Sequence, residues 1–187
     1  MAWKEKSYKL ISACPMLMHN GQTADPTNKF AKALKSVSSK RAKTDADYEE
    51  MAKIEFMAGL YMSKSGPIIP AENLTAMLIR AAKKRREGPS ATSGMFVLEH
   101  SQLEYEGPRD AAELWEDEQF RHVALVSVQR ARIARTRPIF SNWTAVVKVT
   151  YEDEQVNEAQ LDDWFKIAGE QIGIGDWRPR FGRFAIE

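Results

Sequence analysis

The sequence lacks several residue patterns that define large classes of protein. Its single cysteine, Cys14, excludes an intramolecular disulfide framework, and one cysteine with three scattered histidines offers no metal-ligand spacing. No apolar run approaches the length of a membrane span, and the N-terminal residues lack the apolar core of a signal peptide. No glycine-rich run precedes a Gly-Lys-Ser/Thr sequence. These absences favour a cytoplasmic protein without a metal or other cofactor.

The residues that are present suit one folded domain with unevenly distributed charge. Hydrophobic residues make up 43% of the 187 positions, so we expect a single domain over residues 1–187. The net charge is only +1, but residues 27–43 and 120–150 each hold six basic residues and no acid. Residues 99–118 hold eight acids and one arginine. Local fields of this kind can steer a polyanion even when the total charge is small.

Hydrophobic periodicity and turn residues predict the order of the elements. We expect a helical insertion at about 28–56 and an acidic excursion at about 99–118. The remaining elements are a strand (7–14), a helix (72–86), a strand (122–130), a strand (143–151), a helix (157–170) and a strand (182–186). This β-α-β-β-α-β order is the ferredoxin-like order shared with RNA-recognition modules. The predicted fold is therefore α+β, an antiparallel four-stranded sheet with two helices on one face.

Three segments, in the same order along nearly the whole chain, share their pattern with a known family. They are Ile68–Arg80 (IIPAENLTAMLIR), Leu17–Gly21 after the first strand, and Ile172–Gly175 with Phe181–Phe184 near the C-terminus. They resemble the IPGSSLKGALR segment, the first turn and the C-terminal glycine-rich loop of the RAMP superfamily, the ferredoxin-like RNA-binding proteins of CRISPR effector complexes. Ala71 stands where the family usually has glycine, and no long thumb-like insertion is evident. The resemblance is thus to a divergent, stand-alone member of the kind that a phage or mobile element would encode.

The resemblance implies sequence-independent binding of single-stranded RNA by a protein without catalytic activity, with single-stranded DNA left open as a ligand. It also implies head-to-tail assembly along the strand, as an oligomer or with CRISPR-like effector subunits. The acidic 99–118 segment would then meet the basic 28–43 helix of the next copy, because their charges are complementary.

Residues 173–187 form the densest cluster of candidate nucleic-acid contacts. Arginine forks suit phosphate, glycine lets a backbone approach a ligand, and aromatic rings stack on bases. The candidates are Gly173, Gly175, Trp177, Arg178, Arg180, Phe181, Gly182, Arg183 and Phe184. A second set, in a basic segment expected to span a strand end and a turn, is Arg130, Arg132, Arg135 and Arg137. A third set ends a helix, where cations also suit the helix dipole: Lys83, Lys84, Arg85 and Arg86.

Two other functions stay open. One is a protein-interaction module, such as a phage-encoded inhibitor or mimic of an effector subunit, whose basic patches meet an acidic protein surface. The other is a metal-independent endoribonuclease with His19 as general acid or base, or Asp25 in the loop after the first strand. No second catalytic partner for His19 is evident in the sequence, and Pro26-Thr27 after Asp25 indicates a helix N-terminus, so we expect a protein that is not an enzyme.

Overall fold

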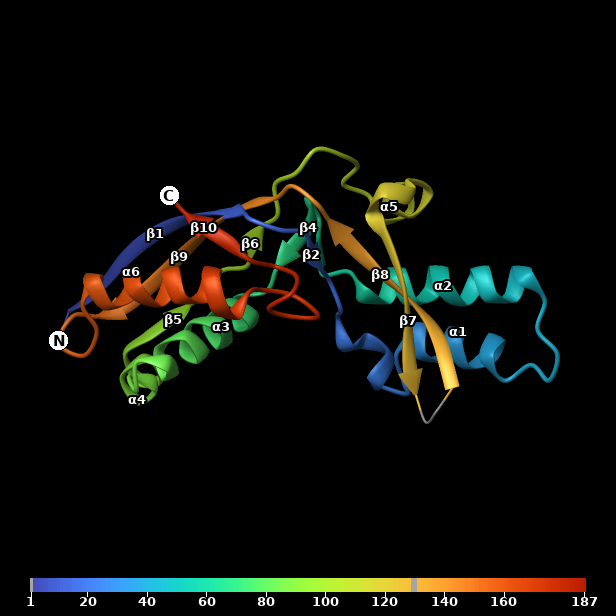
Figure 1. Ribbon diagram of the computed structural model, residues 1–187, viewed down its shortest axis with the longest axis horizontal. Helices are drawn as coiled ribbons and strands as arrows, with labels where there is room; N and C mark the ends of the chain where they lie inside the picture. Colours follow the sequence, from blue (N-terminus) through green and yellow to red (C-terminus); the bar gives the residue numbers. More distant parts are fainter. Residues whose placement is uncertain (1, 129–130) are drawn as a thin grey trace. The chain divides into compact units, whose positions relative to one another are not determined.

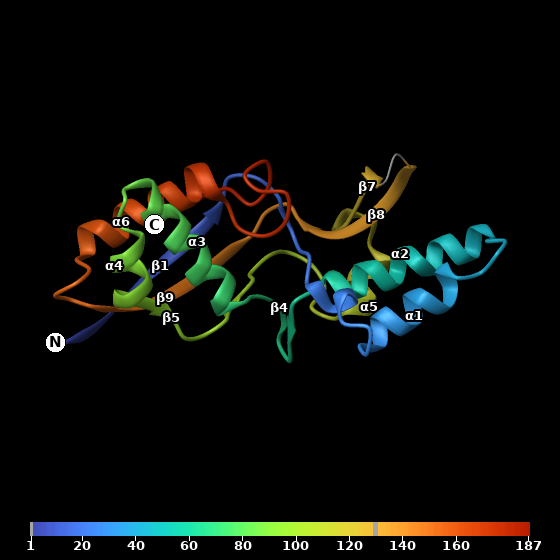
Figure 2. The same cartoon turned by 90° about the horizontal axis from the view of Figure 1, so that it is seen from below.

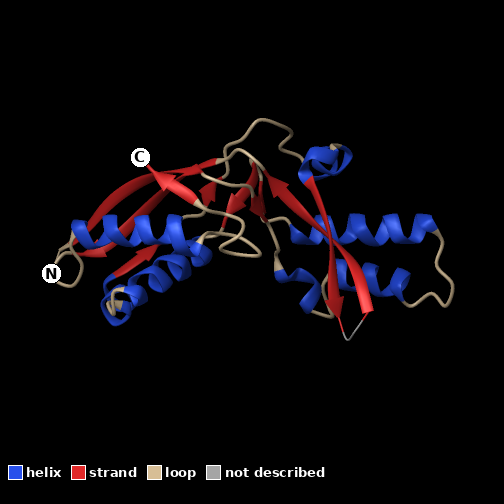
Figure 3. Cartoon of the chain, in the orientation of Figure 1, coloured by secondary structure: helices blue, strands red, loops and turns tan. Residues whose placement is uncertain are grey.

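The computed structural model describes residues 2–128 and 131–187, and the chain divides into two compact units. Unit 1 consists of Met1–Met16, Met62–Glu106 and Phe140–Glu187, and unit 2 consists of Leu17–Tyr61 and Gly107–Ile139. The chain therefore leaves unit 1 twice and returns to it twice. Both units combine helices with antiparallel strands, so the predicted α+β class is confirmed (Figure 3). Among the described residues, no helix has the length and apolar character needed to cross a membrane.

Unit 1 is built on a four-stranded antiparallel sheet. Its strands are β1 (Trp3–Ser12), β5 (Met95–Val97), β9 (Thr144–Glu152) and β10 (Phe184–Ile186), in the order β10-β1-β9-β5. The helices α3 (Ala71–Lys84) and α6 (Glu158–Ile167) lie on the same face of this sheet, as Figures 1 and 2 show from two directions. The predicted helices at 72–86 and 157–170 are thus confirmed, with ends that differ by a few residues.

Alternation along the strands determines which sheet face packs against the helices. On β9 the buried hydrophobic residues are Ala145, Val147, Val149 and Tyr151, and the residues between them face away from the core. On β1, Tyr8 lies on the covered face and stacks on Phe165 of α6 with ring centroids 3.8 Å apart. The opposite face leaves Trp3 and Val146 exposed.

One strand of the predicted core is wrong. The predicted strand 122–130 corresponds to β7 (Arg121–Val128), which pairs with β8 (Ala131–Phe140) in a different sheet. The place beside β9 is taken by β5, which lies in none of the strands expected from the sequence. The segment expected to hold a turn after residue 130 is the strand β8. Strand pairing is non-local, and three residues are too few for a period-2 pattern to be distinctive.

The smaller elements of unit 1 lie between or after these strands. They are β3 (Met62–Ser63), β4 (Gly66–Ile69) and β6 (Ser101–Gln102), which form a sheet in the order β3-β4-β6, and the helix α4 (Gly88–Gly94). A π-helical turn, Ala168–Ile172, continues α6 and leads into the glycine-arginine loop. This loop, residues 173–183, connects α6 to β10.

Unit 2 consists of a helical pair, a hairpin and short connecting elements. Helices α1 (Lys29–Ser38) and α2 (Asp45–Gly59) confirm the predicted helical insertion after the first strand. The strands β7 and β8 form a hairpin, and β2 (Met16–Leu17) adds a third strand to give a sheet in the order β2-β8-β7. The helix α5 (Ala111–Glu116) lies in the acidic excursion. Two 3-10 turns, Gly21–Ala24 and Glu118–Phe120, complete the unit. The buried residues of α2 all lie in its C-terminal half, and α1 has none.

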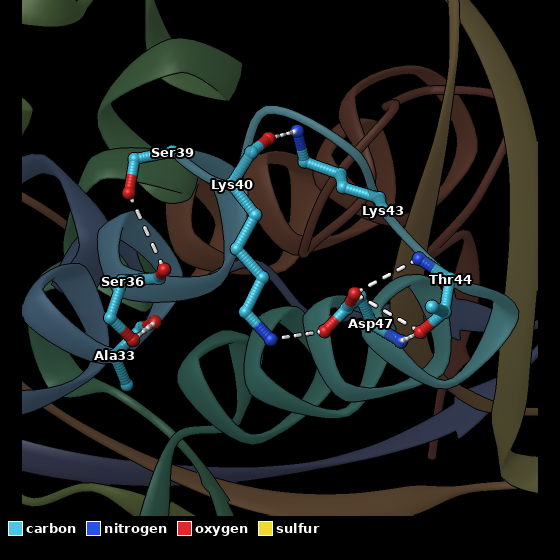
Figure 4. A network of polar contacts seen from close by, with 7 residues as sticks. All are labelled: Ala33, Ser36, Ser39, Lys40, Lys43, Thr44 and Asp47. Atoms are coloured by element: carbon cyan, nitrogen blue, oxygen red, sulfur yellow. Dashed lines mark hydrogen bonds and ion pairs between the residues drawn. The ribbon is translucent and has the colours of Figure 1, made fainter.

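Local polar contacts hold the turn between α1 and α2 (Figure 4). Thr44 and Asp47 form a capping box at the start of α2, and the Lys40 ammonium group pairs with the Asp47 carboxylate. The Lys43 ammonium group donates to the Lys40 carbonyl oxygen at 2.9 Å. The hydrogen bond from Lys40, followed by that from the Thr44 backbone, lowers the pKa of Asp47 to about 2. Part of the basic 27–43 run therefore has a structural role.

Candidate nucleic-acid interface

The glycine-arginine loop is shaped by contacts within its own backbone. Gly182 has φ 76°, its N–H donates to the Pro15 carbonyl oxygen at 2.8 Å, and its own carbonyl accepts from Ile174 N at 2.9 Å. A Cβ atom on Gly182 would overlap the Ile174 carbonyl oxygen. Gly182 is buried, and the backbone that it approaches closely belongs to the same loop. Glycine is therefore needed here for packing within the loop. Gly173 is buried in the same way, and Gly175 is half-buried.

The three arginines of this loop differ in exposure. Arg180 and Arg183 are exposed, and the Arg183 side chain donates to the Pro179 carbonyl oxygen at 2.8 Å. Arg178 is half-buried. Burial lowers the pKa of Arg178, the charge of Arg80 on α3 lowers it further, and Asp176 acts in the opposite direction. Arg178 is therefore within electrostatic reach of one cation, Arg80, and of one acid, Asp176.

The aromatic candidates of the loop divide into two groups. Trp177 and Phe181 are half-buried, with ring centroids 6.2 Å apart. Phe184 is 3% exposed and meets Trp143 edge-on in the core, so the expectation that it stacks on a base is wrong. The reason is strand alternation, since Phe184 begins β10 and points to the covered face of the sheet.

The second arginine set lies on one strand and is divided between its two sides. Arg132 is exposed, whereas Arg135 and Arg137 are half-buried and, by their odd spacing from Arg132, lie on the opposite side of β8. The Arg135 guanidinium pairs with the Glu55 carboxylate of α2, which also accepts from Thr136 N at 3.2 Å. Arg130 lies outside the described residues.

A polar cleft in unit 2 brings together candidates that are far apart in the sequence. It has a volume of about 280 Å³. It is lined by His19, Asn20, Thr23, Leu34, Glu55, Ala58, Gly59, Arg135 and Arg137. His19, the candidate acid or base, therefore shares a cleft with two arginines that were predicted to bind phosphate. An endoribonuclease activity through His19 stays a prediction.

The third basic set, at the end of α3, is partly committed to the fold. Arg85 makes a two-pronged ion pair with Asp163 of α6, at 2.6 Å and 2.9 Å, and thereby links the two helices. Lys84 is exposed. Lys83 and Arg86 line a hollow of about 440 Å³ together with Gly88, Pro89, Thr92 and Ser93. The ion pair with Asp163 therefore accounts for Arg85, whereas Lys83, Lys84 and Arg86 remain candidate nucleic-acid contacts.

Asp25 has a local role. Its carboxylate accepts from Thr27 N at 2.8 Å and from the Thr27 hydroxyl at 2.7 Å, which lowers the pKa of Asp25. These bonds shape the turn that enters α1, whose N-cap is Asn28. Within residues 2–128 and 131–187, no group of three or more His, Cys, Asp or Glu side chains is arranged to hold a metal ion.

The acidic excursion packs within its own chain. Trp115 of α5 meets Phe56 of α2 edge-on at 5.4 Å, and Glu116 lies 3.8 Å from the Lys53 ammonium group. Glu118 also pairs with Arg121 at 3.2 Å, and Asp110 caps α5. Several acids of the segment therefore have partners within the chain, and the predicted contact with a second copy stays a prediction.

Sequence reasoning missed two residues of these surfaces. Arg80 lies in the Ile68–Arg80 segment, but its position next to the C-terminal loop depends on the packing of α3. Glu55 lies within the predicted helical insertion, and its pairing with Arg135 spans 80 positions. No signal within a few residues of either position could have identified its partner. Neither a family model nor a curated protein matches the chain.

Proposed function

We propose that this chain is a RAMP-like, ferredoxin-fold protein that binds single-stranded RNA without cleaving it. The binding surface is the outer side of the glycine-arginine loop in unit 1, with Arg178, Arg180 and Arg183, together with Arg80 of α3. The observation that carries the proposal is the exposure of Arg180 and Arg183 on the loop and of Arg80 on α3, with Arg178 half-buried in the same loop. Guanidinium groups on a glycine-containing loop suit the phosphates of a nucleic-acid backbone.

The strand order supports the ferredoxin-like part of the proposal. When the small elements β3, β4, α4 and β6 are set aside, the order of elements in unit 1 is β1, α3, β5, β9, α6, β10, which is a β-α-β-β-α-β sequence. Its strands lie in the spatial order fourth, first, third, second, and each neighbouring pair is antiparallel. This order follows when the second strand is β5 and the excursions of the chain into unit 2 are set aside.

The two sides of the loop have separate roles in this proposal. Gly173 and Gly182 set the path of the loop by close packing, and the exposed arginines supply the phosphate contacts. Trp177 and Phe181 are half-exposed and offer rings on which bases can stack, which is tolerant of sequence. A backbone-directed site of this kind fits binding without sequence preference.

Fluorescence anisotropy with a labelled single-stranded RNA, an ssDNA and an RNA hairpin over a salt series tests the proposal. Arg178→Ala/Arg180→Ala should weaken RNA binding at least tenfold, because charge-assisted hydrogen bonds contribute about 1.5–3 kcal/mol each. The slope of the logarithm of the binding constant against the logarithm of the salt concentration should become shallower by about 1.4, because each phosphate contact to a single strand contributes about 0.7. Lys32→Ala/Lys35→Ala on α1 removes the same charge and should change little. Equal losses in both double variants, or no binding at low salt, would contradict the proposal.

The open face of the four-stranded sheet favours a second candidate, a protein-interaction module. Trp3 is 51% exposed and Val146 is 58% exposed on this face, and the Trp3 ring lies 5.1 Å from that of Phe96. The charged residues beside them are paired within the chain, Lys148 with Glu5 at 2.7 Å and Lys9 with Glu187 at 2.6 Å. A surface of apolar and internally neutralised groups suits a protein partner better than a polyanion. Failure of all three nucleic acids to bind would favour this candidate.

A further inference from the structure

The sheet of unit 2 has two sides along which a further strand could be added. Its order is β2-β8-β7, so β7 lies at one edge along its whole length. On the other side, β2 has only two residues and is too short to cover the length of β8. An edge strand presents a row of backbone N–H and C=O groups that can pair with another chain. Proteins usually protect such edges with charges, proline or a covering element.

The free side of β8 is protected in these ways. Three arginines and a proline lie on the strand: Arg132, Arg135, Arg137 and Pro138. The Glu55 carboxylate of α2 accepts a hydrogen bond from Thr136 N at 3.2 Å and also pairs with the Arg135 guanidinium. A helix of the same unit therefore satisfies an edge donor of β8, and the charges and the proline disfavour another strand there.

The edge of β7 has none of this protection. Residues 122–128 are His-Val-Ala-Leu-Val-Ser-Val, without an acid, a lysine, an arginine or a proline. Val123 is 61% exposed and Leu125 is 67% exposed, and their spacing of two places them on one side of the strand. Among the described residues, only those of β8 form backbone hydrogen bonds with Val123–Val126. The strand β7 therefore offers both an open edge and exposed apolar side chains.

The edge of the unit 1 sheet differs from that of β7. The strand β10 pairs with Leu10–Ser12 of β1, so the earlier part of β1 also lies at an edge. That part carries Lys4, Glu5 and Lys6, each of which forms an ion pair within the chain. A second copy that paired symmetrically at these positions would set like charges opposite each other, which is unfavourable. Of these two edges, only that of β7 can therefore accept a copy of itself without charge repulsion.

We propose that β7 is a dimerisation strand, which pairs antiparallel with β7 of a second copy about a twofold axis at Ala124. In this register Val123 lies opposite Leu125 of the second copy, and Leu125 lies opposite its Val123. The four exposed apolar side chains then cover one another on one side of the joined sheet. Arg121, whose charge is already paired with Glu118 at 3.2 Å, lies opposite Ser127 of the second copy, so like charges do not meet.

The twofold arrangement favours a second copy over an unrelated strand as the occupant of this edge. An uncharged strand pairs with an uncharged strand, and the interface is isologous, so both open edges are covered in one step. The two three-stranded sheets become one continuous sheet, and β7 has no edge left for a third copy. This dimer needs neither RNA nor the loop of unit 1, so it goes beyond the proposed function and does not depend on it.

Analytical ultracentrifugation of the full-length protein without RNA tests this pairing. The wild type should form a dimer whose fraction increases with concentration and which does not grow further. Val123→Lys/Leu125→Lys sets lysine against lysine at both apolar pairs and should raise the dissociation constant roughly 100-fold or more. The matched control Val146→Lys/Leu98→Lys changes the same residue types at positions of unit 1 that are 58% and 71% exposed, and it should dimerise like the wild type.

Three results would overturn the proposal. They are a wild type that remains monomeric at its highest soluble concentration, assemblies that grow beyond two copies, and equal weakening in the two lysine variants. The first would leave the edge of β7 to a strand of another protein, and the second would favour head-to-tail assembly. Circular dichroism of each variant separates lost pairing from lost folding.

A charge-exchange variant tests the register. Val123→Lys/Leu125→Glu sets lysine opposite glutamate at both pairs, because each position faces the other across the twofold axis. At low salt the dissociation constant of this variant should lie within about tenfold of the wild type, and added salt should raise it. A register centred on Leu125 would set glutamate against glutamate. A dimer as weak as that of the double-lysine variant would therefore overturn the proposed pairing.

Hydrogen exchange locates the contact between the copies. The amides of β7 that face away from β8 should gain protection as the protein concentration rises. Dimerisation without such a gain would place the contact elsewhere and overturn the proposal. Arg178→Ala/Arg180→Ala should dimerise like the wild type, so failure of the RNA proposal and failure of this one can be recognised separately.

Discussion

Unit 1 and unit 2 hold their arginines in different ways. In unit 1, Arg178 lies half-buried on a loop whose path is set by backbone contacts, and Arg180 and Arg183 of the same loop are exposed. In unit 2, Arg135 lies on a strand and is fixed by the nearly buried Glu55 carboxylate. The first arrangement exposes guanidinium groups to solvent. The second uses a guanidinium group to join a strand to a helix.

The cores of the two units differ as well. Unit 1 packs two helices on one face of a continuous sheet, with Trp164 fully buried in α6. Its indole N–H donates to the Glu87 carboxylate at 2.6 Å, so this core also anchors a polar contact. Unit 2 has a smaller core around the C-terminal half of α2, with Phe56 at its centre. We expect each core to stabilise mainly its own unit.

The largest predicted effect comes from truncating one core at a time. Phe56→Ala and Trp164→Ala should each lower the free energy of unfolding by about 3–5 kcal/mol, the usual cost of removing a fully buried aromatic ring. Hydrogen exchange should show the loss of protection mainly in unit 2 for Phe56→Ala and mainly in unit 1 for Trp164→Ala. Equal losses across both units in either variant would show that the chain unfolds as one cooperative body.

A smaller effect is expected from glycine substitutions that contrast the loop of unit 1 with a turn of unit 2. Gly182→Ala should destabilise the protein by about 2–4 kcal/mol, because a positive φ and overlap with a backbone oxygen act together. Gly21→Ala is the matched control, because a Cβ atom there meets nothing within 4 Å. Urea unfolding measures both changes. A stable Gly182→Ala protein with an unchanged midpoint would refute the backbone account of the loop.

The smallest predicted effect is an acid dependence of the start of α2. Hydrogen bonds from Lys40 and Thr44 lower the pKa of Asp47 to about 2, below its usual value of 3.8. A lowered carboxyl pKa stabilises the fold above about pH 4, and this contribution disappears as the pH falls towards 2. The urea midpoint of the wild type should therefore fall more steeply between pH 4 and pH 2 than that of Asp47→Asn. Parallel pH profiles of the two proteins would show that the ionised Asp47 carboxylate contributes nothing to the free energy of unfolding.

Asp162 is the counterpart of this test in unit 1. The hydrogen bond from Lys6, followed by that from Tyr8, lowers the pKa of Asp162. The Tyr8 hydroxyl donates to this carboxylate at 2.6 Å and joins β1 to α6. Asp162→Asn should likewise flatten the acid dependence of unfolding. Its effect should appear in the hydrogen-exchange protection of unit 1, whereas that of Asp47→Asn should appear in unit 2.

Local features of both units could be read from the sequence. The helix expected at 157–170 is α6, and Asn157 caps it in a capping box with Gln160. The helical insertion was expected at about 28–56, and the structure has α1 and α2 there, with Thr44 as the N-cap of α2. Such signals lie within one or two helical turns, so a single sequence contains them completely. The density of arginine and glycine near the C-terminus is likewise visible in a single sequence.

The partners of these local elements depend on the tertiary structure. A Val- and Leu-rich strand can pair with any suitable edge, so the sequence alone could not decide that β5, and not β7, lies beside β9. The pairing of Arg135 with Glu55 and the approach of Arg80 to Arg178 join distant positions in the same way. The sequence by itself determined where the main helices form, because capping and periodicity are local interactions. Which arginines face an acid, another cation or a cleft was decided only when folding brought distant segments together.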